Sequence, residues 1–257
     1  YDKFNLSTHE GIIARIKVLA RLPIDERRLP KDGRFRWTNP SAVSSVEVRV
    51  SMMPTVFGEN AVLRLFDPNL AFLTLEELGF SSEHRDSIEQ ALAFSSGLII
   101  VTGPTGSGKT TALYAMLARL NNGKRNIITI EDPVERRITG IRQIEIGGNT
   151  LLTFPSVLRS VLRQDPDVLM IGEVRDKESA ELALQSALTG HLVLTTLHAS
   201  SADGVEIRLR QMGIPNYLIE STLRLAVSTK LVPSTHSGKG RVLQSGCISV
   251  SYTHLRA

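Results

Sequence analysis

The sequence predicts an α/β fold in which helices cover both faces of a largely parallel sheet. Two patterns support this prediction. Apolar runs with few polar residues, typical of strands buried on both sides, alternate with segments of helical periodicity. Each run is also followed by glycine or polar residues, as expected at the carboxyl ends of parallel strands, where ligands bind. The four clearest runs are residues 98–102, 126–130, 167–171 and 191–197.

Helices are expected between these strands, because apolar side chains recur there every three to four residues. One helix is expected over residues 156–164, with Ser156 as its N-cap. Another is expected over residues 177–189, beginning after the N-cap Asp176 and ending at Gly190.

The first 69 residues show a different pattern, with short strands that alternate apolar and polar side chains. Residues 46–51 place three valines on one face and Arg49 on the other. Arg64 shares a face with apolar neighbours. Glycine and proline in residues 29–35 and 67–70 predict turns. We therefore expect a small α+β domain, an α/β domain and a tail, over residues 1–69, 70–249 and 250–257.

The composition is ordinary for a globular chain, with 42% hydrophobic and 22% charged residues and a net charge of +4. This charge permits contact with nucleic acid or a membrane surface without requiring it. No apolar run approaches the roughly 20 residues of a membrane-spanning helix. The single cysteine, Cys247, excludes an intramolecular disulfide and favours a reducing compartment. Because the first residue is Tyr1, we expect a fragment of a longer chain.

The segment GPTGSGKT, residues 103–110, fits the pattern of a phosphate-binding loop between a strand and a helix. Its glycines let backbone N–H groups surround phosphates, and the helix N-terminus adds positive potential. Lys109 would reach the β- and γ-phosphates, and Thr110 would ligate Mg²⁺. A glycine-rich turn without function is the alternative. The predicted nucleotide-binding residues are Gly103, Pro104, Thr105, Gly106, Ser107, Gly108, Lys109, Thr110 and Thr111.

Polar residues follow the other three strands. Glu131 and Asp132 end the second strand, Glu173 follows the third and His198 the fourth. Because the carboxyl ends of parallel strands meet at one edge, these side chains are expected beside the phosphate loop. A carboxylate there holds Mg²⁺ or polarises the attacking water, and Glu173 is the expected general base. Taken singly, each acidic residue could instead be a solvated loop residue or a helix cap. The expected metal ligands are Thr110, Asp132 and Glu173, and the expected catalytic residues here are Glu173, Glu131 and His198.

Two arginines of the first domain are candidates for a further role. Phosphoryl transfer gains from a positive charge that a neighbouring subunit supplies. Arg49 and Arg64 lie on cleanly alternating strands, and Arg64 stands between apolar neighbours, which is costly unless a partner covers it. Simple solvation remains the alternative for both.

Taken together, these motifs resemble the secretion-superfamily ATPases that drive type II secretion and type IV pilus assembly. The resemblance extends from about Glu10 to Val232. It rests on several ordered blocks, which include VRVSMMPTVFGENAVLRLFD, the phosphate loop, NIITIEDPVE, GEVRD, TGHLVLTTLH and RLRQMGIP.

The resemblance implies a RecA-like domain joined flexibly to an N-terminal domain related to the PAS fold. It implies ATP and Mg²⁺, and a homo-hexamer in the bacterial cytoplasm that docks on an inner-membrane platform protein. It assigns Glu131, Asp132 and Glu135 to the family's aspartate box and Glu173 to its Walker B segment. Arginines at the positions of Arg49 and Arg64 approach a neighbour's nucleotide in this family, and Arg34 and Arg208 match family arginines less closely.

The end of the chain departs from many assembly-type members, which carry a four-cysteine zinc module after the position of Leu231. Since this chain has only Cys247, no zinc site is expected. Residues 231–242 resemble the shorter tail of zinc-free members, including retraction-type ATPases. Residues 250–257 are expected to be a non-native tail.

The expected function is therefore an ATP-driven motor for a type IV pilus or a type II secretion pseudopilus. A motor for DNA uptake or nucleic-acid translocation, and one for pilus retraction, are alternatives. No direct nucleic-acid contact is expected, because the arginines are scattered among carboxylates and no aromatic stripe for base stacking is evident. A nucleotide-dependent scaffold without hydrolysis is a third possibility, against which Glu173 argues.

Two histidines lie at the ends of the fourth strand. A strand rises about 3.3 Å per residue, so His191 and His198 are expected roughly 23 Å apart and cannot share a metal ion. We expect His198 at the active-site edge and His191 in a structural or subunit-contact role.

Overall fold

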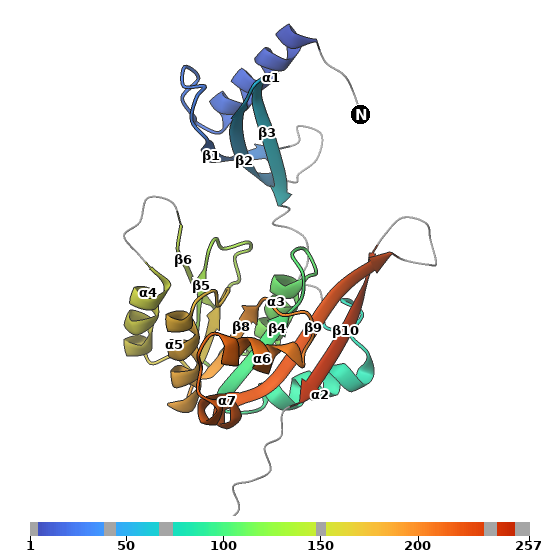
Figure 1. Cartoon of the computed structure of the whole chain (residues 1–257), viewed down its shortest axis with the longest axis vertical. Helices are drawn as coiled ribbons and strands as arrows, with labels where there is room; N and C mark the ends of the chain where they lie inside the picture. The colour runs from blue at the N-terminus through green and yellow to red at the C-terminus, as the bar shows by residue number, and fades with distance from the viewer. Residues whose placement is uncertain (1–4, 39–44, 67–73, 148–152, 234–240, 250–257) are drawn as a thin grey trace, which may run out of the picture. The chain divides into compact units, whose positions relative to one another are not determined.

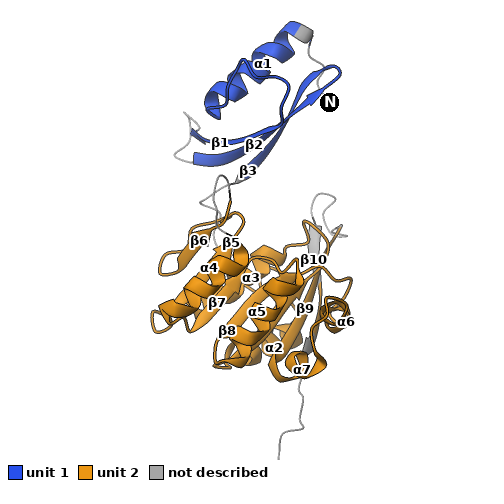
Figure 2. Ribbon diagram, turned by 60° about the vertical axis from the view of Figure 1, so that its left-hand side comes forward, with its two compact units in different colours: residues 1–71 blue, residues 72–257 orange. Residues whose placement is uncertain are grey.

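The computed structural model describes residues 5–38, 45–66, 74–147, 153–233 and 241–249 (Figure 1). The chain divides into two units, residues 1–71 and 72–257 (Figure 2). The expected turn at 67–70 and the expected tail at 250–257 lie outside the described residues. Among the helices described, none combines the length and apolar character that crossing a bilayer requires.

The first unit packs helix α1 (Leu6–Leu19) on an antiparallel sheet. Asn5 caps the helix, because its side chain accepts a hydrogen bond from the Thr8 N–H at 2.8 Å. Val48 and Val50 are buried in the core beneath α1, as their alternation with Arg49 predicts. The strands, in sheet order, are β1 (Lys31–Thr38), β2 (Ser45–Thr55) and β3 (Gly58–Phe66).

The turn expected over residues 29–35 is wrong, because Lys31 already begins β1. Gly33 lies inside this strand, opposite Val50. A Cβ atom at Gly33 would lie 3.0 Å from the Cβ of Ala20, at the end of α1. The glycine therefore allows a close approach of helix and sheet rather than a change of chain direction.

The second unit contains a seven-stranded sheet in the order β10-β9-β4-β8-β7-β5-β6. Neighbouring strands are parallel throughout, except for the antiparallel pair β9–β10. The predicted largely parallel α/β fold is confirmed. The strands are β4 (Gly97–Thr102), β5 (Ile127–Glu131), β6 (Arg142–Glu145), β7 (Val168–Ile171), β8 (Leu192–Leu197), β9 (Leu223–Pro233) and β10 (Arg241–Ser249).

Helices cover both faces of this sheet (Figures 1 and 2). Alternate side chains of β4, such as Ile99 and Ile100, enter opposite hydrophobic cores, which explains why its apolar run is continuous. Helices α2 (Ser82–Leu92) and α3 (Lys109–Leu120) pack on one face. On the other face lie α4 (Phe154–Val161), α5 (Lys177–Leu188), α6 (Gly204–Gln211) and α7 (Asn216–Thr222).

The starts of α4 and α5 test the expected N-caps. Asp176 caps α5 by accepting a hydrogen bond from the Ser179 N–H at 2.8 Å, and Gly190 follows the helix with a φ of 112°, as predicted. For α4 the prediction is wrong. Thr153 is the N-cap and Ser156 is the third helical residue, whose hydroxyl accepts the Thr153 N–H in a capping box.

Candidate functional site

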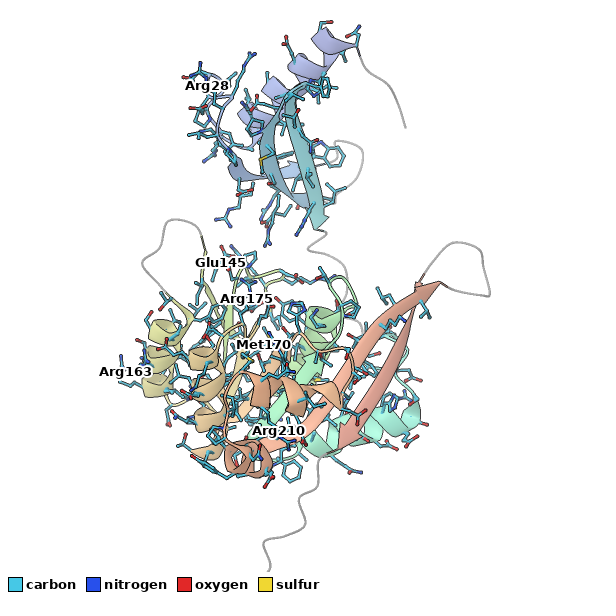
Figure 3. The ribbon with its side chains drawn as sticks, in the orientation of Figure 1. Arg28, Glu145, Arg163, Met170, Arg175 and Arg210 are labelled. Atoms are coloured by element: carbon cyan, nitrogen blue, oxygen red, sulfur yellow. The ribbon has the colours of Figure 1, made fainter. Side chains whose placement is uncertain are left out.

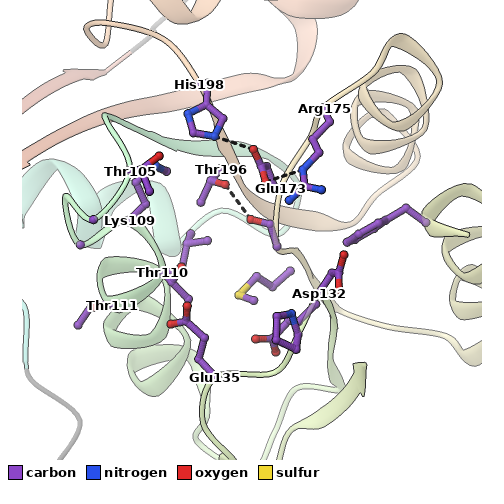
Figure 4. Close-up of a pocket in the computed structure, with 18 of the residues that line it drawn as sticks. Thr105, Lys109, Thr110, Thr111, Asp132, Glu135, Glu173, Arg175, Thr196 and His198 are labelled. Carbon is purple, nitrogen blue, oxygen red and sulfur yellow. Dashed lines mark hydrogen bonds and ion pairs between the residues drawn. The ribbon is translucent and has the colours of Figure 1, made fainter. Parts of the chain in front are cut away.

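A cavity of about 730 Å³ opens in the second unit where β4, β5, β7 and β8 end (Figure 4). Glu145 and Arg175 lie at this end of the unit, whereas Arg163 lies on its outer flank (Figure 3). The cavity brings together most of the side chains that the sequence places at the strand ends. Its polar lining includes Thr105, Lys109, Thr110, Thr111, Asp132, Glu135, Glu173, Arg175, Thr196 and His198.

The phosphate loop connects β4 to α3. Gly106 and Gly108 have φ angles of 74° and 91°, which other residues rarely adopt, and both glycines line the cavity. Gly103 lies so close to β9 that a Cβ atom there would stand 2.2 Å from the Thr229 carbonyl oxygen. The Ser107 hydroxyl is buried at 2.9 Å from the Thr229 hydroxyl. Strand β9 thus supports the back of the loop.

Lys109 extends along the loop. Its ammonium donates hydrogen bonds to the carbonyl oxygens of Gly103 at 2.9 Å and Pro104 at 3.0 Å. Burial lowers the pKa of Lys109, and the negative charge of Glu173 partly opposes this shift. The Lys109 and Glu173 side chains both line the cavity, so the two charges face the same space.

Glu173 follows β7 and accepts contacts on both carboxylate oxygens. Oε1 lies 2.7 Å from His198 Nε2, and Oε2 lies 2.7 Å from Arg175 Nε (Figure 4). The Glu173 side chain is 21% exposed, while those of His198 and Arg175 are 52% and 65% exposed. Nearby, the Thr196 hydroxyl donates to the Gly172 carbonyl at 2.7 Å and fixes the end of β7 against β8.

The three acidic residues at and after the end of β5 have different surroundings. All three line the cavity, and Asp132 and Glu135 are exposed. Glu131 is 2% exposed, and its Oε1 accepts hydrogen bonds from the Thr129 hydroxyl at 2.6 Å and from Gln143 Nε2 at 3.1 Å. Its Oε2 accepts a hydrogen bond from the Tyr114 hydroxyl.

Tyr114 and Gln143 are residues that the sequence analysis does not single out. Tyr114 lies on α3 four residues after Thr110, so both occupy the same side of the helix. A polar hydroxyl on an otherwise apolar stretch of this helix is the one signal that points to Tyr114. Burial raises the pKa of Tyr114, and the Glu131 charge raises it further, so the phenol stays protonated.

Arg34, Arg49 and Arg64 belong to the first unit. Arg49 of β2 lies directly opposite Arg34 of β1 and Arg64 of β3, so the three form one row across the sheet. Directly opposed residues share a face, and this face is the one turned away from Val48 and Val50. Arg208 lies on the exposed side of α6 in the second unit.

The two histidines stand at opposite ends of β8. His198 follows the strand and contacts Glu173. His191 precedes the strand, and its Nδ1 lies 2.9 Å from the Ser186 carbonyl oxygen near the end of α5. That contact ties the helix end to the strand start.

Comparison with known proteins gives a consistent picture. Residues 3–253 match the model of a family described as "Type II/IV secretion system protein". Type II secretion system ATPase E of Vibrio cholerae is 47% identical over 221 residues, which are 86% of this chain and 44% of that protein. Type II secretion system protein E of Pseudomonas aeruginosa gives the same identity and coverage.

Solved structures share the fold. The Legionella pneumophila ATPase DotB matches with a TM-score of 0.78 at 24% identity, covering 98% of this chain and 71% of DotB. The pilus retraction motor PilT with bound ADP matches with a TM-score of 0.72 at 31% identity, covering 86% of this chain and 64% of PilT. The chain spans less than half the length of the secretion proteins above.

Proposed function

Because the chain belongs to the family of type II/IV secretion system proteins, we propose that it is a Mg²⁺-dependent ATPase and the motor of a secretion or pilus-assembly machine. The observation that carries the proposal is the position of Glu173. Its carboxylate contacts His198 at 2.7 Å and acts electrostatically on Lys109 of the phosphate loop. A carboxylate beside a phosphate-binding lysine is the arrangement that nucleotide hydrolysis needs.

The phosphate loop is suited to bind a nucleoside triphosphate. The positive φ angles of Gly106 and Gly108 curve the backbone, so its N–H groups can surround phosphate oxygens. A phosphate would replace the carbonyls of Gly103 and Pro104 as partners of Lys109. Thr110, Asp132 and Glu173 supply oxygen ligands of the kind that Mg²⁺ prefers. When bound, Mg²⁺ neutralises charge on the β- and γ-phosphates.

Glu173 is the proposed general base, assisted by His198. A general base needs a carboxylate oxygen that faces the attacking water. Each Glu173 oxygen accepts one contact at 2.7 Å, from His198 or from Arg175, and keeps a second lone pair that can accept the proton of the water.

Arg49 and Arg64 are proposed to act on the nucleotide of a neighbouring subunit in a ring of six. The strand register places the three arginines side by side on one face of the sheet, and guanidinium groups bind phosphate oxygens well. Mixing Glu173→Ala subunits with Arg49→Ala subunits tests this role. Some interfaces of a mixed ring regain both parts, so partial recovery of ATPase activity is expected, and no recovery in confirmed mixed rings contradicts it.

The ring is proposed to work in the bacterial cytoplasm, docked on an inner-membrane platform protein. Relatives named for type II secretion at 47% identity support a pseudopilus as its cargo system, and the 31% identity to PilT supports a pilus motor as the second candidate. A chimera in which this chain replaces the matching 221 residues of the Vibrio cholerae ATPase E separates the two, because only a secretion motor is expected to restore secretion.

Mg²⁺-dependent phosphate release tests the ATPase proposal. Lys109→Ala removes the phosphate-binding charge and Glu173→Ala removes the proposed base, so each variant is expected to lose turnover entirely. Glu178→Ala is the matched control, because this glutamate lies on the surface of α5. Its side chain is 58% exposed, and that of its ion-pair partner Arg159 is 54% exposed. Undiminished turnover in Lys109→Ala or Glu173→Ala would contradict the proposal.

A further inference from the structure

The segment between β5 and β6 carries two carboxylates of the cavity, Asp132 and Glu135. It has neither helix nor strand structure from Asp132 to Ile138, and side chains of other elements hold its backbone instead. These contacts determine where its carboxylates stand. The Val134 N–H donates to Glu145 Oε2 at 3.1 Å, the Glu135 and Arg136 N–H groups donate to the Tyr114 hydroxyl at 3.2 and 3.4 Å, and the Ile138 N–H donates to Gln143 Oε1 at 2.7 Å.

The two side chains that hold the middle of this segment meet at one buried carboxylate. The Tyr114 hydroxyl donates its hydrogen to Glu131 Oε2, and the Tyr114 phenolic oxygen accepts hydrogen bonds from the N–H groups of Glu135 and Arg136. Gln143 donates to Glu131 Oε1 at 3.1 Å and to the Arg136 carbonyl at 2.8 Å. Glu131 therefore orients both side chains. Its own two oxygens accept hydrogen bonds from protein groups.

Tyr114 also links the segment to the phosphate loop. It lies on α3, whose first turn carries Lys109 and Thr110. A shift of α3 would therefore move the Tyr114 hydroxyl, and with it the Glu135 backbone N–H that donates to this hydroxyl. The Tyr114 ring is packed in the core between α3 and the sheet and is 3% exposed, so the hydroxyl has little freedom to move independently of the helix.

We propose that the Tyr114 hydroxyl and the Glu131 carboxylate are positioning groups that fix Asp132 and Glu135 relative to the phosphate loop. In this inference Glu131 acts through Tyr114 and Gln143 and not on the nucleotide itself. The inference rests on the proposed ATPase function, because it assigns a purpose to two residues of that site.

Two variants with similar chemical changes test it. Tyr114→Phe keeps the ring in the core and removes only the hydroxyl. Thr129→Val is the matched control, because Thr129 donates to the same carboxylate at 2.6 Å from within β5. Tyr114→Phe is expected to lower kcat by about tenfold to a hundredfold with KM for ATP unchanged within twofold, since small misplacements of reacting groups have effects of this size. Thr129→Val is expected to lower kcat by at most about threefold.

Amide hydrogen exchange supplies a readout that does not need turnover. Exchange across residues 134–138 is expected to accelerate at least tenfold in Tyr114→Phe and to stay near the unmodified rate in Thr129→Val. Unchanged exchange in Tyr114→Phe overturns the proposal, as does an equal fall of kcat in both variants. If the unmodified chain releases no phosphate, the proposed ATPase function fails, and the exchange comparison still decides whether Tyr114 positions the segment.

Discussion

Replacing Lys17 by methionine is expected to destabilise the N-terminal unit. The Lys17 side chain is 1% exposed, and its ammonium contacts Glu59 at 2.6 Å and the Glu26 carbonyl at 2.8 Å. The Glu59 side chain is 9% exposed, so Lys17→Met leaves a carboxylate in the interior without its counter-charge. This ion pair also joins α1 to β3, the strand that carries Arg64.

The size of the loss follows from the burial of the carboxylate that remains. Removing one partner of a buried ion pair costs about 3–5 kcal/mol. Because the Glu59 side chain is 9% exposed and keeps some contact with water, we expect a loss of about 3–4 kcal/mol at pH 7.

Urea unfolding followed by tryptophan fluorescence measures this loss. Trp37 is the single tryptophan of the sequence and lies in β1, so its signal reports on the N-terminal unit. Arg28→Met, at an exposed cation of the same unit (Figure 3), is the control and should change stability by less than about 0.5 kcal/mol. Adding Glu59→Gln to Lys17→Met should recover more than half of the loss. A loss below about 1 kcal/mol for Lys17→Met, or no recovery in the double variant, would refute the reasoning.

Two further predictions concern the second unit, residues 72–257. His198→Ala is expected to lower turnover directly, whereas His191→Ala should lower Tm and leave the turnover of assembled rings intact; equal loss of turnover in both, with rings present, would contradict this division. Gly103→Ala is expected to abolish ADP binding in a calorimetric titration, because its Cβ would stand 2.2 Å from the Thr229 carbonyl. Gly123→Ala is its control, with a φ of 77° and nothing within 4 Å of the added Cβ. It should cost about 1–2 kcal/mol of stability and leave ADP binding unchanged.

The central strands could be predicted because burial on both faces leaves a direct trace in the sequence. Residues of β7 are apolar at every position, as burial on both faces of a parallel sheet demands. Strand β9 leaves no such trace. It lies beside the edge strand β10, and polar residues such as Ser228 and Thr229 interrupt its apolar pattern.

The candidate site, too, could be predicted from the sequence only in part. Position at the end of a parallel strand predicts that Glu173 and His198 meet, and their contact at 2.7 Å follows from the sheet order. Position at a strand end predicts the same surroundings for Glu131 and Asp132, although the structure places them in different ones. Glu131 is the last residue of β5 and is buried, whereas Asp132 has left the strand and is exposed.

Contacts between distant parts of the chain could not be read from periodicity. Alternation separates Arg49 from the valines of its strand but leaves Arg64 among apolar neighbours. Only the strand register brings the two opposite each other, and Arg49 opposite Arg34. Tyr114 looks like one more large residue of an amphipathic helix. Its hydroxyl gains a role only once folding places β5 and the following segment beside it.

The most direct test of the central claim is a comparison of ATP binding and phosphate release in Glu173→Gln and the unmodified chain. This substitution removes the proposed base and keeps the shape of the side chain. We predict ATP affinity within about threefold of the unmodified chain and turnover lowered by at least a hundredfold, in line with the size of general-base effects. Turnover within twofold of the unmodified rate, with ATP bound equally well, would contradict the assignment of Glu173 and with it the proposed site.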